Sequence, residues 1–271
     1  MKVWIPMLFS VAAVLMPRAA VAQVMVVSNA VQEREALPGE VYAGTIRLRN
    51  TSTDMQEVRV YQTGYLFHAD GRSLHVAPDS QPRSNAGWMR VTPMSLVIAA
   101  GDEVDVSYTV SVPGTGVTAG TYWSMVMVEP LAQDARDSNA SGAPSVGVRT
   151  VLRFGIQVAT HVSGEVAHGL GIENARVIGG STGGRELTFE LVNTGDAAYR
   201  PNVSVEIFDV QGTAIATLEE QRGLMYPGTS TLQRFALADL PPGQYEALVV
   251  VDTGSPEVFG AQIRLIVAAT R

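Results

Sequence analysis

Apolar and polar residues alternate with a period of two along most of the chain. In Ile46–Arg49 the apolar side chains point to one face and the two arginines to the other, and the same alternation recurs in 58–61, 104–110 and 203–207. Turn signals rich in Gly and Pro separate these runs. Short alternating strands at this spacing predict β-sandwich domains, and no convincing amphipathic helix interrupts them.

The strand plan occurs twice. Asn50 in "LRNTS" and Asn193 in "LVNTG" each end an alternating strand, 143 positions apart, and Tyr122 in "GTY" and Tyr245 in "GQY" each open an apolar strand, 123 positions apart. The matching residues occur in the same order in both halves of the chain, and the distance in sequence between them falls from 143 to 123. This indicates two copies of one sandwich, the second with shorter loops. We expect the asparagines to bond nearby backbone as a strand leaves into a turn, and the tyrosines to resemble the tyrosine corner of immunoglobulin-like domains.

The chain therefore divides into a leader and two domains. Residues 1–22 combine a basic start, the apolar run 3–16 and the small-residue cleavage pattern at 20–22, which is typical of a secretory signal peptide. We predict a first immunoglobulin-like domain at 23–162 and a second at 164–271. No other apolar run approaches the length of a membrane-spanning helix, so no span is expected in the mature chain.

Composition excludes several classes of function. The chain has no cysteine, and Lys2 is its only lysine, so thiol catalysis, zinc–cysteine sites and lysine Schiff-base chemistry are excluded from the mature protein. Outside the leader, 17 arginines face 26 acidic residues, a net charge of −9. This acidity argues against nucleic-acid binding and against docking on anionic lipid.

No arrangement of side chains indicates an enzyme. The four histidines lack the spacing of a metal site, and we interpret His161 and His168 as solvated residues flanking the domain junction. Residues 179–183 fit the G-x-S-x-G pattern, but a strand-like segment follows where a helix would be needed, which favours a hairpin loop. We expect no catalytic residues, no metal and no cofactor, and hence a protein that binds a partner.

One strand stands out by its length. Alternation continues through 146–158, or roughly 43 Å at about 3.3 Å per residue, well beyond an ordinary strand. Either this is a long last strand lying wholly in the core, or part of it is an open edge that lends side chains to another protein. The side chains on its apolar face are Val146, Val148, Thr150, Leu152, Phe154, Ile156 and Val158.

Three segments of the first domain resemble the periplasmic pilus chaperones of the PapD type. They are Pro38–Glu40 leading into "AGTIRLRNTS", "GTYWSMVMVEP" at 120–130, and "VGVRTVLRFGIQV" at 146–158. The resemblance implies a periplasmic protein with two immunoglobulin-like domains that acts in pilus assembly. It also implies that the long last strand of the first domain completes an unfinished pilin-like, β-rich subunit by strand addition.

The family also grips the C-terminal carboxylate of the subunit with an arginine–lysine pair. This chain has no lysine there, because Gln157 falls where the strand lysine is expected. The resemblance leaves Arg149 or Arg153 as a substitute, with Arg34 as the partner from the first strand.

The first domain resembles the peptidoglycan-binding domain of the WxL-interacting surface proteins more weakly. The shared features are the Pro-Gly start, the Asn-x-Ser strand end and a closing strand that contains arginine. We therefore expect a non-enzymatic exported bacterial protein. It is either a periplasmic chaperone-like binder of small secreted or pilus subunits, or a structural or adhesion protein of the cell surface that binds a cell-wall component.

Overall fold

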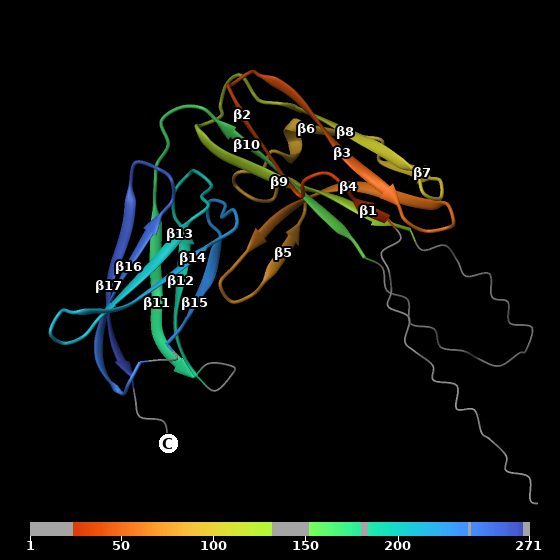
Figure 1. Cartoon of the computed structure of the whole chain (residues 1–271). Coiled ribbons are helices and arrows are strands. Elements are labelled where there is room, and N and C mark those ends of the chain that lie inside the picture. The colour runs from red at the N-terminus through yellow and green to blue at the C-terminus, as the bar shows by residue number, and fades with distance from the viewer. Residues whose placement is uncertain (1–23, 132–151, 180–183, 238–239, 268–271) are drawn as a thin grey trace, which may run out of the picture.

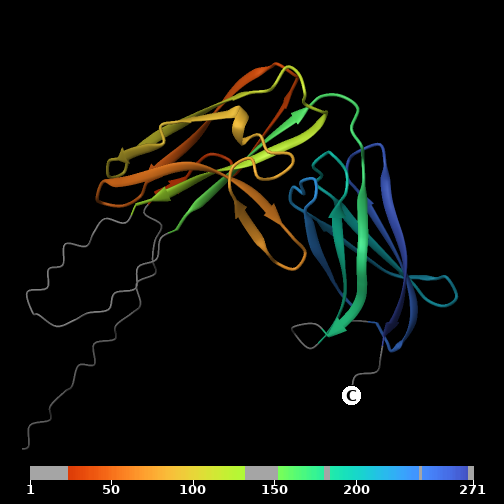
Figure 2. The same ribbon diagram turned by 180° about the vertical axis from the view of Figure 1, so that it is seen from behind.

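The chain folds into two β-sandwiches in tandem (Figure 1, Figure 2). The structure is a computed structural model that describes residues 24–131, 152–179, 184–237 and 240–267. The predicted all-β class with two tandem immunoglobulin-like domains is confirmed. The expected leader at 1–22 lies outside the described residues. Within those residues, no helix has the length and apolar character that crossing a membrane requires.

The first sandwich is made of two sheets. One has the strand order β1–β3–β8–β6, with β1 at Val24–Val26, β3 at Val41–Asn50, β8 at Glu103–Ser111 and β6 at Met89–Thr92. The other has the order β2–β10–β9–β4–β5, and β7 also pairs with β4. Its strands are β2 at Val31–Ala36, β10 at Phe154–Val162, β9 at Gly120–Pro130, β4 at Gln56–Phe67, β5 at Ser73–Val76 and β7 at Ser95–Ile98.

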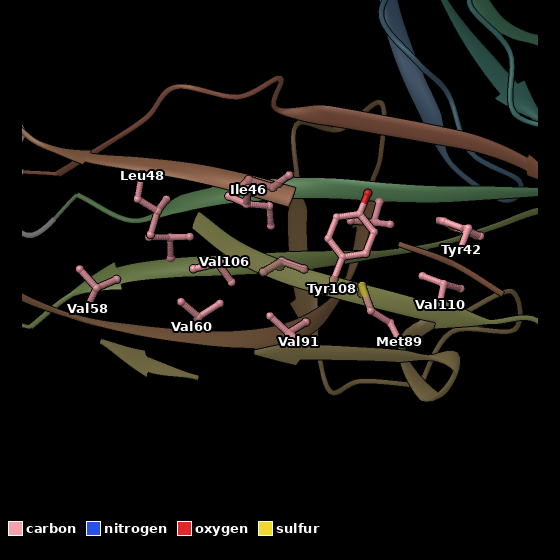
Figure 3. Close-up of a cluster of buried hydrophobic side chains, with 14 of the residues drawn as sticks. Tyr42, Ile46, Leu48, Val58, Val60, Met89, Val91, Val106, Tyr108 and Val110 are labelled. Atoms are coloured by element: carbon pink, nitrogen blue, oxygen red, sulfur yellow. The ribbon is translucent and has the colours of Figure 1, made fainter. Parts of the chain in front are cut away.

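The core of the first sandwich follows from the alternation in the sequence. Figure 3 shows apolar side chains from β3, β4, β6 and β8 meeting between the two sheets. Ile46 and Leu48 are fully buried, whereas Arg47 lies on the outer face and pairs with Asp105 of β8 at 2.8 Å. Burying each large apolar side chain contributes roughly 1.5–3 kcal/mol, so this face is a main source of the attraction between the two sheets.

The second sandwich has the same plan with fewer strands. One sheet is β11–β12–β15, with β11 at Leu170–Gly179, β12 at Arg185–Asn193 and β15 at Ser230–Ala236. The other is β14–β13–β16–β17, with β14 at Ala214–Gln221, β13 at Asn202–Phe208, β16 at Gly243–Asp252 and β17 at Val258–Val267. Phe189 and Phe235 stack between the sheets with ring centroids 5.8 Å apart.

The repeated asparagines play the same part in both sandwiches. Asn50 and Asn193 are fully buried, and each donates Nδ2 to the carbonyl oxygen four residues later, at 2.7 and 2.8 Å. Each also accepts the N–H two residues later through Oδ1, and donates to a distant carbonyl, that of Ile98 or Met225. The expected bonds to nearby backbone are present, and each asparagine also bonds a segment distant in sequence, which sequence spacing did not reveal.

The repeated tyrosines also act locally. The Tyr122 hydroxyl lies 3.0 Å from the Thr118 hydroxyl, and the Tyr245 hydroxyl donates to the carbonyl of Pro241 at 2.8 Å. In both cases the partner lies four residues upstream, as in a tyrosine corner. Their interpretation as structural residues is confirmed.

Candidate partner-binding edge and domain seam

The first strand of the first sandwich changes sheets, and this uncovers part of β10. β1 pairs with β3 in one sheet, whereas β2 pairs with β10 in the other and runs parallel to it from Val31 onward. β2 therefore covers β10 only from Gln157 to Val162. From Phe154 to Ile156, β10 is paired with β9 alone among the described strands. An edge with backbone groups left unpaired can accept an added strand.

The groups at this open edge can be assigned from the hydrogen-bond pattern. The Gln157 N–H donates to the Ala30 carbonyl at 2.8 Å, so it points away from β9. Backbone groups alternate sides along a strand, so Gly155 and Arg153 also direct their N–H and C=O away from β9. Neither has a backbone partner on that side within the described part of the chain.

The predicted apolar face of this strand is divided between core and surface. Ile156 and Val158 are each 1% exposed and belong to the core of the first sandwich. Phe154 packs against the edge of that core, and Leu152 is 47% exposed. The other predicted members, Val146, Val148 and Thr150, lie outside the described residues, so strand donation by the whole 146–158 run stays a prediction.

The candidate arginines do not converge. Arg34 lies on β2 opposite Thr160, whereas Arg153 precedes β10 by one residue and shares a face with Gln157. Seven positions separate Thr160 from Arg153, or roughly 23 Å, and they point to opposite faces of the sheet. One carboxylate cannot bridge Arg34 and Arg153 in this structure. Arg149 lies outside the described residues.

Arg153 instead joins a charged row with residues of β4 and β9. On the outer face of the sheet, Arg59 of β4 donates to Oε2 of Glu129 on β9 at 2.7 Å. The Arg153 Nε lies 3.1 Å from the other oxygen of the same carboxylate. Hydrogen bonding from Arg59, helped by the charge of Arg153, holds the pKa of Glu129 below its usual value, so the row reads plus, minus, plus at neutral pH.

An aromatic stack joins the two sandwiches next to this edge. Trp123 of β9 is 1% exposed and stacks on Tyr226 of the second sandwich, with ring centroids 4.6 Å apart and planes 6° apart. The Trp123 Nε1 donates to the Tyr65 carbonyl at 2.7 Å, and the Tyr226 hydroxyl donates to Oε1 of Gln157 at 2.7 Å. The second sandwich thus holds β10 at the residue where the cover by β2 begins.

The β4–β5 hairpin forms a second connection. Both views show this hairpin leaving the first sandwich toward the second (Figure 1, Figure 2). Phe67 at its tip packs against the core of the second sandwich, and the Ala69 N–H donates to the Ser230 hydroxyl at 2.9 Å. The stack and the hairpin fix the two sandwiches at two separate places.

A polar chain completes the seam. Arg200 of the second sandwich forms a two-pronged ion pair with Glu33 of β2, and His161 Nε2 lies 3.3 Å from the same carboxylate. The Thr121 hydroxyl lies 2.9 Å from His161 Nδ1 and accepts the Ala198 N–H at 2.8 Å. Because the ionised Glu33 carboxylate can only accept, His161 donates to it from Nε2–H, and in the neutral imidazole Nδ1 then accepts a hydrogen bond from the Thr121 hydroxyl.

The structure corrects the interpretation of the two junction histidines as solvated. His161 is part of the seam, and His168 Nδ1 lies 3.1 Å from the Tyr199 hydroxyl. Both are held by partners distant in sequence, which a linear pattern does not reveal. The seam residues Glu33, Arg200 and Tyr226 were missed for the same reason, because each sits among unremarkable polar or turn residues.

The Glu33–Arg200 pair makes the seam sensitive to acid. Hydrogen bonding from Arg200 lowers the pKa of Glu33 against the opposing effect of burial. The pKa of Glu33 in the folded protein therefore lies below its value in the unfolded chain, about 4.3. The ionised carboxylate stabilises the fold fully above the unfolded pKa, and this stabilisation is lost as the pH falls through the folded pKa. Wild type should be more stable than Glu33→Gln at pH 7, and the difference should shrink below about pH 4. Urea unfolding at several pH values measures it, and a difference independent of pH would contradict the assignment.

The described residues offer little for catalysis. They contain no group of three or more acidic or histidine side chains that could hold a metal ion. Two surface cavities, of about 620 Å³ beside Trp88 and Met94 and about 590 Å³ between β2 and β3, are lined by no nucleophile paired with a base. What the described residues do present is an open strand edge beside a fixed domain seam.

Comparisons with known proteins identify structural likenesses only. No family model and no curated protein matches the sequence. A chain from a chaperone–tip adhesin complex of CFA/I fimbriae biogenesis shares 13% identity at a TM-score of 0.48, covering 91% of this chain and 100% of that one. A chain from the CsuC–CsuE chaperone–tip adhesion subunit complex of Acinetobacter baumannii shares 14% identity at a TM-score of 0.42, covering 90% of this chain and 98% of that one.

A chain from the Salmonella enterica complex of the SafA pilin with the SafB chaperone gives 13% identity and a TM-score of 0.42, with coverage of 90% and 98%. CsuC and SafB are the chaperones of these two complexes, and the likeness of this chain to them is one of overall structure. Because the TM-scores lie below 0.5, what the chain does has to be inferred from its own residues.

Proposed function

We propose that the chain is a non-enzymatic, exported, chaperone-like protein that binds a small β-rich subunit by strand addition to β10. The observation that carries this proposal is the open side of β10 at Gly155, where the sheet change between β1 and β2 leaves backbone donors and acceptors unpaired within the described residues. Main-chain bonds to such an edge supply affinity, and alternate side-chain sites supply selectivity.

The neighbourhood of the edge suits a reversible partner. Leu152 is exposed and continues the apolar face of Phe154, so an added strand would cover it. The second sandwich holds β10 through Gln157, which keeps the edge preorganised. The predicted leader and the resemblance of first-domain motifs to pilus chaperones support a periplasmic location and a role in pilus assembly.

The variant Leu152→Asp tests this function. A charge at an exposed position should leave the fold intact but oppose burial by a partner strand, lowering the amount of captured partner about tenfold. The matched control is Val210→Asp, which changes a 70% exposed side chain on a turn of the second sandwich. Tagged wild type, Leu152→Asp and Val210→Asp are each purified from the native envelope, and bound proteins are identified by mass spectrometry.

The expected result is one small exported β-rich protein, in about equal amount with wild type and with Val210→Asp, and depleted with Leu152→Asp. Equal capture by all three proteins would contradict binding at β10. Retention of the wild type on insoluble wall material, with no protein partner in comparable amount, would contradict the chaperone-like function and favour a surface protein.

A further inference from the structure

The charged row at the open edge of β10 ends on a cation. Arg59 of β4, Glu129 of β9 and Arg153, the residue before β10, follow one another on the outer face of the sheet. Glu129 is only 8% exposed, whereas the side chains of Arg59 and Arg153 are 57% and 58% exposed. One carboxylate faces two guanidinium groups, so the row carries a net positive charge on a chain that is acidic as a whole.

Arg153 keeps donors for a further acceptor. Its Nε approaches Glu129, while its two terminal nitrogens contact no acceptor among the described residues. A guanidinium has five N–H donors, and its planar ends match a carboxylate. A residue of an added strand that lies opposite Arg153 would therefore face a cation that Glu129 neutralises only in part.

The neighbouring row, two residues along, carries no charge and is apolar next to the open edge. Tyr61 of β4 is in register with Met127 of β9, and Met127 with Gly155 of β10. The Met125 thioether lies directly over Gly155, where any Cβ would overlap it. A side chain beside Gly155 would therefore rest against methionine, which packs well against aliphatic and aromatic groups.

We propose that the strand added to β10 carries an acidic side chain opposite Arg153 and an apolar side chain opposite Gly155. The inference rests on the proposed strand addition and specifies the class of strand that fits. Side chains directly opposite on neighbouring strands lie about 4.5–5.5 Å apart at their Cβ atoms, close enough for opposite charges to attract and like charges to repel. Arg153 and Gly155 lie on the same face of the sheet, two residues apart. The added strand should therefore carry an acidic and an apolar residue two positions apart, whether it runs parallel or antiparallel to β10.

Synthetic strands provide the test. The probe is the blocked peptide acetyl-Thr-Val-Thr-Glu-Thr-Val-Thr-amide, whose symmetric face presents an acid flanked by apolar residues in both directions. The matched control has lysine in place of the glutamate. Binding is measured by NMR from the backbone amide signals of Arg153 and Gly155 in the isotope-labelled mature protein. We expect the glutamate peptide to bind about fivefold more tightly than the lysine peptide, with the difference shrinking at high salt.

The variant Arg153→Glu should reverse this preference without changing the fold, because the side chain is exposed. Equal binding of both peptides to wild type, with loss of both in Leu152→Asp, would overturn the charge rule and leave strand addition standing. No change at the Gly155 amide with either peptide at millimolar concentration would contradict both. A peptide with lysine at the centre and a free C-terminal carboxylate that bound better than the glutamate peptide would overturn the rule in favour of a terminal carboxylate.

Discussion

Replacing Trp123 with alanine is expected to lower the free energy of unfolding by about 4 kcal/mol, the usual loss for a large buried aromatic side chain. The indole is 1% exposed, stacks on Tyr226 and lies among side chains from both sandwiches. Its removal leaves a cavity in the seam and takes away the donor to the Tyr65 carbonyl. Urea unfolding followed by circular dichroism measures the change.

The control for this prediction keeps the stack and removes one hydrogen bond. Tyr226→Phe loses the donor to Gln157 but retains the aromatic ring, so we expect a loss of about 1 kcal/mol. If Trp123→Ala unfolded at the same urea concentration as wild type, the stack would not hold the sandwiches together. Because Gln157 lies on β10, both variants should also weaken capture of the partner at the open edge.

The second large effect is expected at Gly120, where β9 begins. Its φ of +115° is a conformation that side chains rarely adopt, and a Cβ would overlap the carbonyl oxygen of Asp196 in the second sandwich. That carbonyl accepts the Thr121 N–H at 2.8 Å, so it cannot move without breaking the seam. We expect Gly120→Ala to cost about 3 kcal/mol, from backbone strain and from the lost contact together.

Gly212 provides the matched control. It also has a positive φ, +81°, but nothing lies within 4 Å of an added Cβ. Gly212→Ala should therefore show the backbone cost alone, about 1 kcal/mol. The difference between the two variants isolates the contact with Asp196, and equal losses would mean that the close approach of the sandwiches at Gly120 contributes nothing. Limited proteolysis near 163–169 should become faster only for Gly120→Ala.

The seam and the open edge are parts of one arrangement. β9 contributes Trp123 to the seam and Glu129 to the charged row. β10 contributes Gln157 to the seam and Gly155 to the open edge. Every residue of β9 is buried, although it lies in a sheet with one outer face. Trp123, at one end of that face, is covered by contact with the second sandwich, and Glu129, at the other end, lies between the side chains of Arg59 and Arg153.

Local rules accounted for much of the fold. The alternation at Ile46 and Leu48 predicts a buried face because side chains in a strand alternate with a period of two. The repeated Asn50 and Asn193 predict strand ends because an asparagine side chain bonds backbone only a few residues away. These features depend on near neighbours in sequence, which is why they could be read from it.

The candidate site could be read only in part. The long apolar run through Phe154 pointed to β10 as the strand of interest, but its pairing depends on where β2 begins relative to Gln157. A change of sheet between β1 and β2 leaves no periodic signal, because β1 is only three apolar residues long and β2, Val31–Ala36, does not alternate apolar with polar residues. The ion pairs of Glu129 likewise join residues that sheet order brings together, and the Glu33–Arg200 pair joins residues that meet only because the two sandwiches are in contact.

The sequence by itself therefore determined the class of fold, the repeated sandwich plan and the absence of cysteine and lysine chemistry, since these depend on composition and on short-range periodicity. The tertiary structure alone decided which part of β10 is covered, which cation remains partly unpaired beside it, and how the second sandwich is fixed to the first. Those properties arise from contacts between strands far apart along the chain, and no local pattern encodes them.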